Sequence, residues 1–413
     1  MAKWKNNEVG MSNQALANIY TSRGRLDEMG AFLCKDGVSA NFIISGGSDD
    51  DERYQPLYQY LDAFVGTCPM IILHNSDIHM EAMVGQSWEY AKVGAERPLW
   101  MVDKRRTDFE PFLGMTPAQI FGALRQLAVK LQYTITPRFE RVVRAHIRIL
   151  ELLDIPVSLT GFRYLCNFTD MGEFNDNVLS LPRSEQEARR IWADLGADSE
   201  DSNSQFDLFR TIISHLAEEA GHSGWEDNNS IASLNILAAL QQNATLLLSV
   251  NDLYADLLMP YLVEELKTAD RPFILLVDNL SLRDENMKEY LRHPGPNCTC
   301  GIIAENVVES IGGEEADFLR FTERMNCFLF FKHSTGKTAQ TLSEIMGRFE
   351  YTRMDVAEGT NRGFFSFLPR DKHQDVHYTT ENRYRIMPEE ITGLRPGQAI
   401  VFETGSDQII RYN

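Results

Sequence analysis

The chain lacks several features that would assign it to a membrane or to an oxidising compartment. Among its 413 residues no apolar run reaches the roughly 18 residues that a membrane span needs, and the opening MAKWKNNEVG has no apolar core of an export signal. Only 6 cysteines occur, which does not resemble a disulfide framework in a chain of this length. We therefore expect a cytoplasmic protein without membrane insertion.

Basic residues are scarce relative to acidic ones. Lys and Arg number 40 against 59 Asp and Glu, which gives a formal net charge of -19. Binding to a phosphate backbone requires clustered cations, so we expect no direct DNA binding by the chain as a whole, although a local basic patch remains compatible with the composition. The hydrophobic content of 43% is that of a globular protein, and the length fits two domains or one large domain with an insertion.

The strongest local signal is the segment 271–282, which reads RPFILLVDNLSL. Its uninterrupted apolar run, Phe273–Val277, is typical of a strand buried on both faces of a parallel sheet, and the run ends in Asp278. In nucleotide-binding α/β domains a carboxylate at the end of such a strand orients magnesium, which is the Walker B position. The alternative is an Asp that only begins the loop after a buried strand.

A strand, a glycine turn and a helix follow one another near residue 45, as in a phosphate-binding loop. A working loop needs a second glycine, a lysine and a hydroxyl at G-x-x-x-x-G-K-[ST] spacing, and no register supplies them. In the register that begins at Gly46, the three places hold Asp51, Glu52 and Arg53. A carboxylate there would repel a triphosphate. The predicted degenerate loop consists of Gly46, Gly47, Ser48, Asp49, Asp50 and Asp51.

The segment STGKT at 334–338 also resembles part of a phosphate loop. The position five before Gly336 is Phe331, so the first glycine of the motif is absent. Gly336, Lys337 and Thr338 form a weak alternative anion site, since they stand between a predicted strand and a predicted helix. The competing interpretation is that Ser334 or Thr335 caps the helix.

Polar clusters elsewhere do not predict a metal site. Two groups contain metal-ligand types and are interpreted as solvated loops, and the pair Cys298 and Cys300 lacks the second pair that a zinc site needs. The first group is His74, Asp77 and His79, and the second is Asp371, His373, Asp375 and His377.

Alternating strands and helices organise most of the chain. Besides the two strands above, buried strands are predicted at 68–73, 98–102, 244–250, 299–304, 325–331 and 399–402. Helices are predicted at 14–29, 54–64, 117–131, 137–153, 184–195, 205–220, 231–240, 251–269 with Pro260 as a kink, 339–347 and 388–394. We therefore predict an α/β fold with a mostly parallel sheet, built from residues 1–104 and 229–413, and an inserted all-helical domain at 105–228.

The order of several pieces in residues 244–413 resembles the C-terminal half of the motor domain of type IV secretion coupling proteins. These are the TraG/TraD-type ATPases related to the FtsK and HerA translocases. The pieces are ATLLLSV, FILLVDNL, GIIAEN, CFLFFKHSTGKTAQTLSEIMG and MPEEITGLRPGQAIVF. The helical block stands where that family carries its all-alpha domain, and NFIISGG where it carries the phosphate loop. The resemblance implies a RecA-like fold, with ATP and magnesium as cofactors of the active members.

The chain departs from the family at the positions that carry chemistry. The Walker A residues are replaced, and the Asp-Glu pair of Walker B is Asp278-Asn279, so an amide takes the place of the carboxylate that polarises the attacking water. The family's polar sensor is best matched by Asn306, and its N-terminal membrane helices have no counterpart here.

These losses favour a protein that has the fold of a coupling ATPase but has lost hydrolysis. The sequence predicts a component of a conjugative or type IV secretion apparatus that needs no cofactor and acts through protein contacts, with an active coupling ATPase, a relaxosome protein or a basic exported protein as partner. The alternative is an active hexameric ATPase or DNA translocase with an atypical phosphate loop. A third interpretation, recruitment of the scaffold to unrelated work, stays open.

Overall fold

The fold is described from a computed structural model of the 413-residue chain. It divides into two compact units, Met1–Gln59 with Ile303–Asn413 and Tyr60–Ile302, which are considered separately below. The residues that the structure describes are 4–5, 19–22, 29–34, 40–47, 50–65, 67–74, 78–91, 98–102, 109–110, 112, 115–166, 182–196, 200–219, 232–233, 236–249, 253–278, 285–311, 315–360, 372–404 and 408–412.

The main sheet has ten described strands in the order β2-β15-β14-β11-β3-β10-β9-β4-β8-β5. Most neighbouring strands with a described register run parallel, and β14 runs antiparallel to both β11 and β15. The prediction of a mostly parallel α/β sheet is therefore confirmed. The strands are β2 (Ile19–Ser22), β15 (Gln408–Tyr412), β14 (Ala399–Glu403), β11 (Cys327–Phe330), β3 (Phe42–Ser45), β10 (Cys298–Ala304), β9 (Phe273–Asp278), β4 (Met70–His74), β8 (Thr245–Ser249) and β5 (Leu99–Val102).

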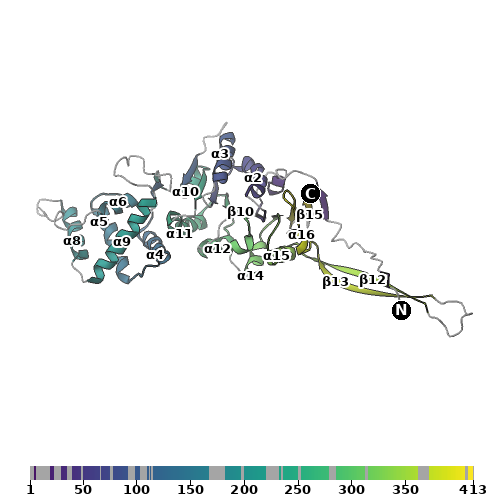
Figure 1. The fold of residues 1–413 in the computed structure, drawn as a ribbon. Helices are drawn as coiled ribbons and strands as arrows, with labels where there is room; N and C mark the ends of the chain where they lie inside the picture. The colour runs from purple at the N-terminus through teal and green to yellow at the C-terminus, as the bar shows by residue number, and fades with distance from the viewer. Residues whose placement is uncertain are drawn as a thin grey trace, which may run out of the picture. The chain divides into compact units, whose positions relative to one another are not determined.

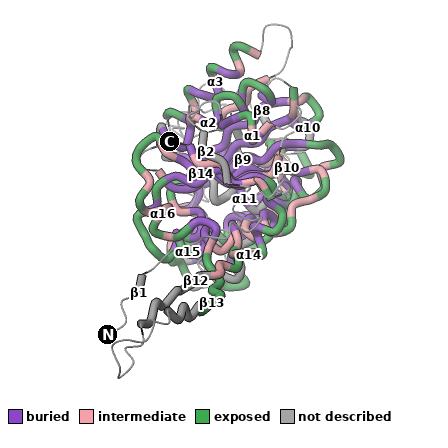
Figure 2. The backbone as a smooth tube through the Cα atoms, turned by 90° about the vertical axis from the view of Figure 1, so that its right-hand side faces the viewer, coloured by how far each residue is buried: buried purple, intermediate pink, exposed green. Residues whose placement is uncertain are grey.

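Within the unit Met1–Gln59 with Ile303–Asn413, β3 pairs in parallel with β11, residue Phe42 opposite Cys327. Every residue of both strands is buried, which explains why their sequences are continuous apolar runs rather than alternating ones. The strand β14, which pairs with β11, is likewise mostly buried, and Figure 2 shows it as a buried segment. Helices of this unit include α1 (Gly30–Leu33), α13 (Val307–Ile311), α14 (Glu315–Thr322), α15 (Gly336–Met346) and α16 (Pro388–Thr392), while α2 (Asp50–Phe64) begins here.

Within the unit Tyr60–Ile302, β4 lies between β8 and β9 and pairs in parallel with both. The focal strand β9 is buried from Phe273 to Asp278, as predicted. Pro260 lies inside α11, which runs from Leu253 to Thr268 as one helix. The other helices beside these strands are α3 (Ile78–Ala91), α10 (Ile236–Gln241) and α12 (Glu285–Arg292).

The same unit contains a run of helices at 115–219 in which the described residues form no strand. Thr116 caps the first helix through a capping box with Gln119, whereas Thr136 makes no side-chain cap bond. The helices pack around a core of aromatic rings that includes Phe139, Phe162 and Phe209. We call this run the helical block; it consists of α4 (Pro117–Lys130), α5 (Pro137–Leu152), α6 (Leu159–Cys166), α8 (Arg183–Gly196) and α9 (Glu200–Glu219).

A long hairpin extends from the unit Met1–Gln59 with Ile303–Asn413. Its strands β12 (Arg348–Thr360) and β13 (Lys372–Tyr384) pair antiparallel over 13 residues each, and the short β1 (Trp4–Lys5) pairs with β12 (Figure 1). The prediction of a polar loop around His373, Asp375 and His377 is wrong, because all three lie within β13; Asp371 is outside the described residues. Pairing with β12 makes this polar segment a strand, and the sequence of β13 alone does not reveal that pairing.

Two predicted helices are corrected. Ile19–Ser22, inside the helix predicted at 14–29, is the strand β2, which pairs in parallel with β15. Ala232–Ser233, inside the helix predicted at 231–240, is the short strand β7 beside β6 (Phe109–Glu110), and the helix begins only at Ile236. In both cases a partner distant in sequence decides the conformation, which local propensity does not reveal. None of the helices in the described part of the chain is both long and apolar enough to cross a bilayer.

Candidate functional site

Three segments meet where the strands β3, β10 and β11 end, all within the unit Met1–Gln59 with Ile303–Asn413. The amide of Gly46 donates to the carbonyl oxygens of Ala304 at 3.2 Å and Glu305 at 3.1 Å. The amide of Gly47 donates to the carbonyl oxygen of Lys332 at 2.9 Å. The turn that the sequence predicts as a degenerate phosphate loop therefore uses its first two amides to bind the neighbouring loops.

Gly46 is held in a conformation that other residues rarely adopt. Its φ is +94°, and a Cβ atom placed on it would lie 2.8 Å from the carbonyl oxygens of Phe331 and Lys332 and 2.9 Å from Nε2 of His333. Both the backbone angle and the close approach of the β11 loop thus require glycine here. Gly47 also has a positive φ, +95°.

Two charged side chains in the first turn of α2, Glu52 and Arg53, are buried. Arg53 is 3% exposed, and its Nη1 donates to the carbonyl oxygen of Gly46 at 3.0 Å. Glu52, in the place of the lysine of a phosphate loop, accepts a hydrogen bond from the amide of Gly397 at 2.8 Å. The cation of Arg53 is thus hydrogen-bonded to the loop, while the side chains of Asp50 and Asp51 lie outside the described part, as do Ser48 and Asp49.

His333 follows β11 and is buried against the same turn. The pKa of its imidazole is lowered to about 4, mainly by burial and also by the nearby charge of Arg53, against a hydrogen bond to the backbone of Ser45 that raises it. The ring is therefore neutral at physiological pH. Among the described residues, Nε2 of His333 has no hydrogen-bond partner. Neither His333 nor Arg53 was predicted as a site residue, although the position of His333 after a buried strand is a signal that could have identified it.

Asn306 and the start of α15 form a second polar cluster in this unit. The Thr335 hydroxyl donates to the Thr338 hydroxyl at 2.8 Å, which donates to Oδ1 of Asn306 at 3.3 Å. The same Oδ1 accepts from the amide of Glu309 at 3.4 Å, so the predicted sensor residue caps α13. Thr335 occupies the N-cap position of α15, as one interpretation predicted, but makes no side-chain cap bond.

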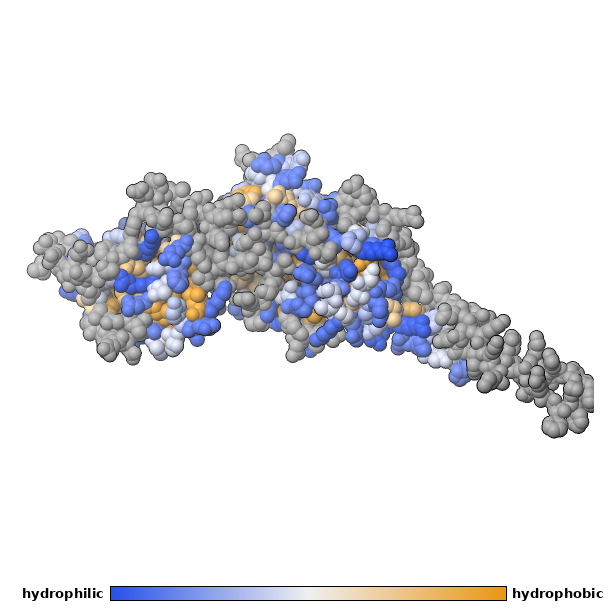
Figure 3. Space-filling view, viewed as in Figure 1, coloured by the Kyte–Doolittle hydropathy of each residue, from blue (hydrophilic) through white to orange (hydrophobic). Residues whose placement is uncertain are grey.

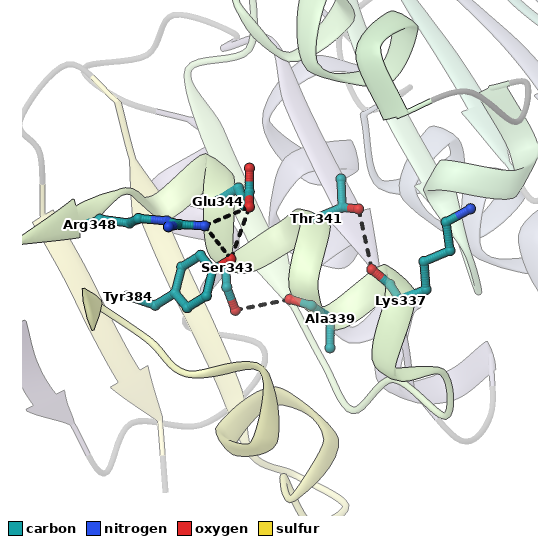
Figure 4. A network of polar contacts seen from close by, with 7 residues as sticks. All are labelled: Lys337, Ala339, Thr341, Ser343, Glu344, Arg348 and Tyr384. Atoms are coloured by element: carbon teal, nitrogen blue, oxygen red, sulfur yellow. Dashed lines mark hydrogen bonds and ion pairs between the residues drawn. The ribbon is translucent and has the colours of Figure 1, made fainter. Parts of the chain in front are cut away.

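The alternative anion site lies on the surface. Gly336 begins α15, and Lys337 is exposed, with its backbone oxygen accepting from the Thr341 hydroxyl at 3.2 Å. In Figure 4 the Lys337 side chain extends away from the body of α15. Of the three predicted residues, only Thr338 is buried, and the hydrogen bonds above join it to Asn306.

The other end of α15 holds the base of the hairpin. Oε1 of Glu344 accepts from Nη2 of Arg348 and from the hydroxyl of Tyr384, both at 2.9 Å (Figure 4). The guanidinium of Arg348 lies 4.2 Å from the centre of the Tyr384 ring. The 11-residue helix α15 therefore has the predicted anion-binding residues in its first turn and contacts both hairpin strands through its last turn.

The Walker B candidate belongs to the other unit. Asp278 is the last residue of β9 and is fully buried, whereas Asn279 lies outside the described residues. Of the residues first weighed as metal ligands, His74 ends β4 and is buried, His79 lies in α3, and Asp77 is outside the described part. Within the described ranges, no three His, Cys, Asp or Glu side chains are grouped so as to hold a metal ion.

Comparison with known proteins identifies the fold. Neither a protein-family profile nor a curated protein sequence matches the chain. Among solved structures, the bacterial conjugative coupling protein TrwBdeltaN70 in its unbound form matches with a TM-score of 0.50 and 12% identity, over 100% of this chain and 94% of that one.

Two further solved structures match with lower scores. The same coupling protein in complex with sulphate has a TM-score of 0.49 and 13% identity, over 90% of this chain and 84% of that one. VirB4 of Thermoanaerobacter pseudethanolicus has a TM-score of 0.47 and 11% identity, over 90% and 88%. From the first match and the sheet described above, the chain has the RecA-like fold of a type IV coupling protein.

Proposed function

We propose that this protein is a component of a conjugative or type IV secretion apparatus that keeps the coupling-protein fold, has lost nucleotide hydrolysis and acts through protein contacts. The coupling-protein fold supports the assignment to a conjugative or type IV secretion apparatus. The loss of hydrolysis is inferred from the replaced residues at the phosphate loop and from Asn279, which replaces a general-base carboxylate.

One observation carries the proposal: the turn after β3 is bonded to its own protein. In a phosphate-binding loop, backbone N–H groups point at the anion and a lysine reaches its oxygens. Here the amides of Gly46 and Gly47 donate to carbonyl oxygens, and Glu52 accepts from the amide of Gly397. Such groups are not available for a phosphate unless these bonds break, and a carboxylate in the lysine position repels the anion.

The proposed partners follow from charge and from the fold. With a net charge of -19 the surface attracts basic partners, for which an active coupling ATPase, a relaxosome protein or an exported protein are the candidates. We also propose that the protein acts in the cytoplasm and without bound ATP or magnesium.

A second candidate function is retained because of Arg53. An inward-facing cation beside the loop is what an atypical nucleotide site would use to offset phosphate charge, and Arg53 lies there, bonded to the oxygen of Gly46. In this reading the protein is an active ATPase or DNA translocase, with Lys337 at the start of α15 as an additional phosphate contact.

Calorimetric titration of the full chain with ATP and magnesium separates the two candidates. If hydrolysis is lost and the amides of the loop stay bonded to the protein's own carbonyl oxygens, no binding is expected up to millimolar nucleotide. Micromolar binding that disappears in Asp278→Ala would contradict the proposal and establish the ATPase. Lys337→Ala then tests the additional contact, and Lys267→Ala, in the last turn of α11, is the matched lysine control.

A further inference from the structure

The helical block contains a cleft whose charges differ from those of the chain as a whole. It has a volume of about 240 Å³ and lies between one face of α5 and one face of α8. The positions on α5 follow helical spacing, as do those on α8, so each set forms a single stripe. The lining residues are Arg138, Arg141, Val142 and Ala145 on α5, and Ile191, Asp194 and Leu195 on α8.

One arginine of the cleft, Arg141, is not neutralised in the way that Arg144 and Arg148 of the same helix are. Arg144 pairs with Glu140 at 2.8 Å, and Arg148 pairs with Glu151 and Glu187 at 3.3 and 3.4 Å. Arg141 is exposed and, among the residues that the structure describes, forms no ion pair or hydrogen bond. It is thus the α5 arginine at the cleft whose charge is open to a ligand.

An acidic side chain lines the same cleft without pairing to Arg141. Asp194 is exposed on α8 and forms no ion pair with any described residue. The two charged residues stand on different helices, and the cleft is also lined by four aliphatic side chains from both helices, Val142, Ala145, Ile191 and Leu195. Over the helical block, Figure 3 shows hydrophobic and hydrophilic side chains next to one another on the visible face.

We propose that this cleft binds a short peptide segment of a partner protein in which an apolar side chain lies between an acidic and a basic residue. The acidic residue pairs with Arg141, the apolar side chain covers the aliphatic side chains of the cleft, and the basic residue pairs with Asp194. The arrangement of opposite charges at the two sides also fixes the direction of the segment.

A phosphate-bearing ligand fits the cleft less well. Phosphate would gain from Arg141, but Asp194 would repel it and the aliphatic side chains would offer it nothing. A purely basic segment would be repelled by the positive charges of Arg141 and Arg138. The charge pattern therefore selects a mixed-charge peptide, although the net charge of the chain favours basic partners elsewhere on its surface.

Fluorescence polarisation with the full chain tests the proposal. The probes are two labelled octapeptides with the cores Glu-Leu-Lys and Lys-Leu-Glu, each compared with its Leu-to-Ser version, and a labelled single-stranded DNA octamer. One of the two leucine peptides is expected to bind, its serine version to bind at least about fivefold more weakly, and the DNA not to bind. Absence of binding by both leucine peptides up to millimolar concentration would overturn the proposal, as would preferential binding of the DNA.

Two matched variants localise the binding. Arg141→Gln should weaken the bound peptide about tenfold, whereas Arg144→Gln, an exposed arginine one turn away that already pairs with Glu140, should change it less than about twofold. Asp194→Asn should weaken binding of the same peptide to a smaller extent than Arg141→Gln does. In the Asp194→Asn protein, a peptide whose basic residue is neutralised should gain affinity relative to the original peptide. Equal effects of Arg141→Gln and Arg144→Gln would mean that general surface charge holds the peptide, which contradicts a defined site.

Discussion

Two buried histidines, one in each unit, both have a lowered pKa but are held by different kinds of structure. Desolvation is the main cause that lowers the pKa of both His146 and His333 to about 4, and a nearby arginine adds to it in each case. His146 lies on α5 among aromatic rings, with the Phe209 ring centre at 4.3 Å, and its Nδ1–H donates to the oxygen of Val142 at 2.7 Å. His333 lies instead against the backbone of the turn at Gly46.

The two regions are therefore held by different kinds of interaction. The helical block is held mainly by side chains that pack on one another. Its turns also contain constrained backbone, with positive φ at Gln132 and Asp154 and no room for a Cβ atom at Gly161. The turn after β3 is defined by backbone groups, which bond to one another across three loops and leave no room for a Cβ atom.

Substitution of Gly46 by alanine should be the most damaging single change. The positive φ is strained for alanine, and the added Cβ would lie within 3 Å of two carbonyl oxygens, so we expect a loss of about 3 kcal/mol or more in the free energy of unfolding. Gly336→Ala is the matched control, since nothing lies within 4 Å of its Cβ position and it begins a helix. Urea denaturation of both variants measures the difference, and equal losses would refute the account of a backbone-defined turn.

Acidification should destabilise both units through their histidines. Each pKa is lower in the folded protein than the 6.5 of the free group, so the unfolded state binds the proton first. The contribution of each histidine to the free energy of unfolding is therefore fully present above pH 6.5. It falls as the pH drops toward 4, where the loss due to each histidine is about 3 kcal/mol.

His146→Phe and His333→Leu should each remove one part of this pH dependence. His146→Phe suits a pocket of aromatic rings and should be well tolerated at pH 7, whereas His333→Leu also loses the hydrogen bond to Ser45. Unfolding free energies at several pH values between 4 and 7 check both. An unchanged slope in His146→Phe would mean that the imidazole becomes solvated on protonation without unfolding the block.

Sequence reasoning succeeded where local pattern determines structure and failed where a distant partner does. The runs at β3, β9 and β10 are continuous and apolar because both faces are buried, and Asp278 stands at the predicted strand end. The strand β13 is mostly polar and β2 has only four residues of mixed character, so neither sequence contains a continuous apolar run and their partners define them. The position of His333 after a buried strand is a local signal, but the contact of His333 with Arg53 could not be predicted, because the two residues are 280 positions apart in the chain.

Capping should matter more in the helical block than at α15. The Thr116 hydroxyl accepts from the amide of Gln119 at 3.3 Å within a capping box, so Thr116→Ala should cost about 1 kcal/mol of unfolding free energy. Thr335 has the same place on α15, but its hydroxyl donates to Thr338 and caps no amide. Thr335→Ala should therefore cost only about half as much or less. Thermal unfolding compares the two, and a larger effect at Thr335 would assign a structural role to the threonine pair.

The smallest expected effect concerns the ion pair at the base of the hairpin. Arg348 and Glu344 are 48% and 31% exposed, so solvent screens their attraction and their coupling should be about 0.5 kcal/mol. A double-mutant cycle with Glu344→Gln and Arg348→Met isolates this coupling, and the pair Arg383 and Glu381, at 42% and 46% exposure, gives the reference. If the backbone defines this unit, breaking the pair leaves the turn at Gly46 intact, because none of its hydrogen bonds involves Glu344. A coupling above about 2 kcal/mol would show that side chains of α15 stabilise the unit as strongly as buried networks do, and the contrast with the helical block would then fail.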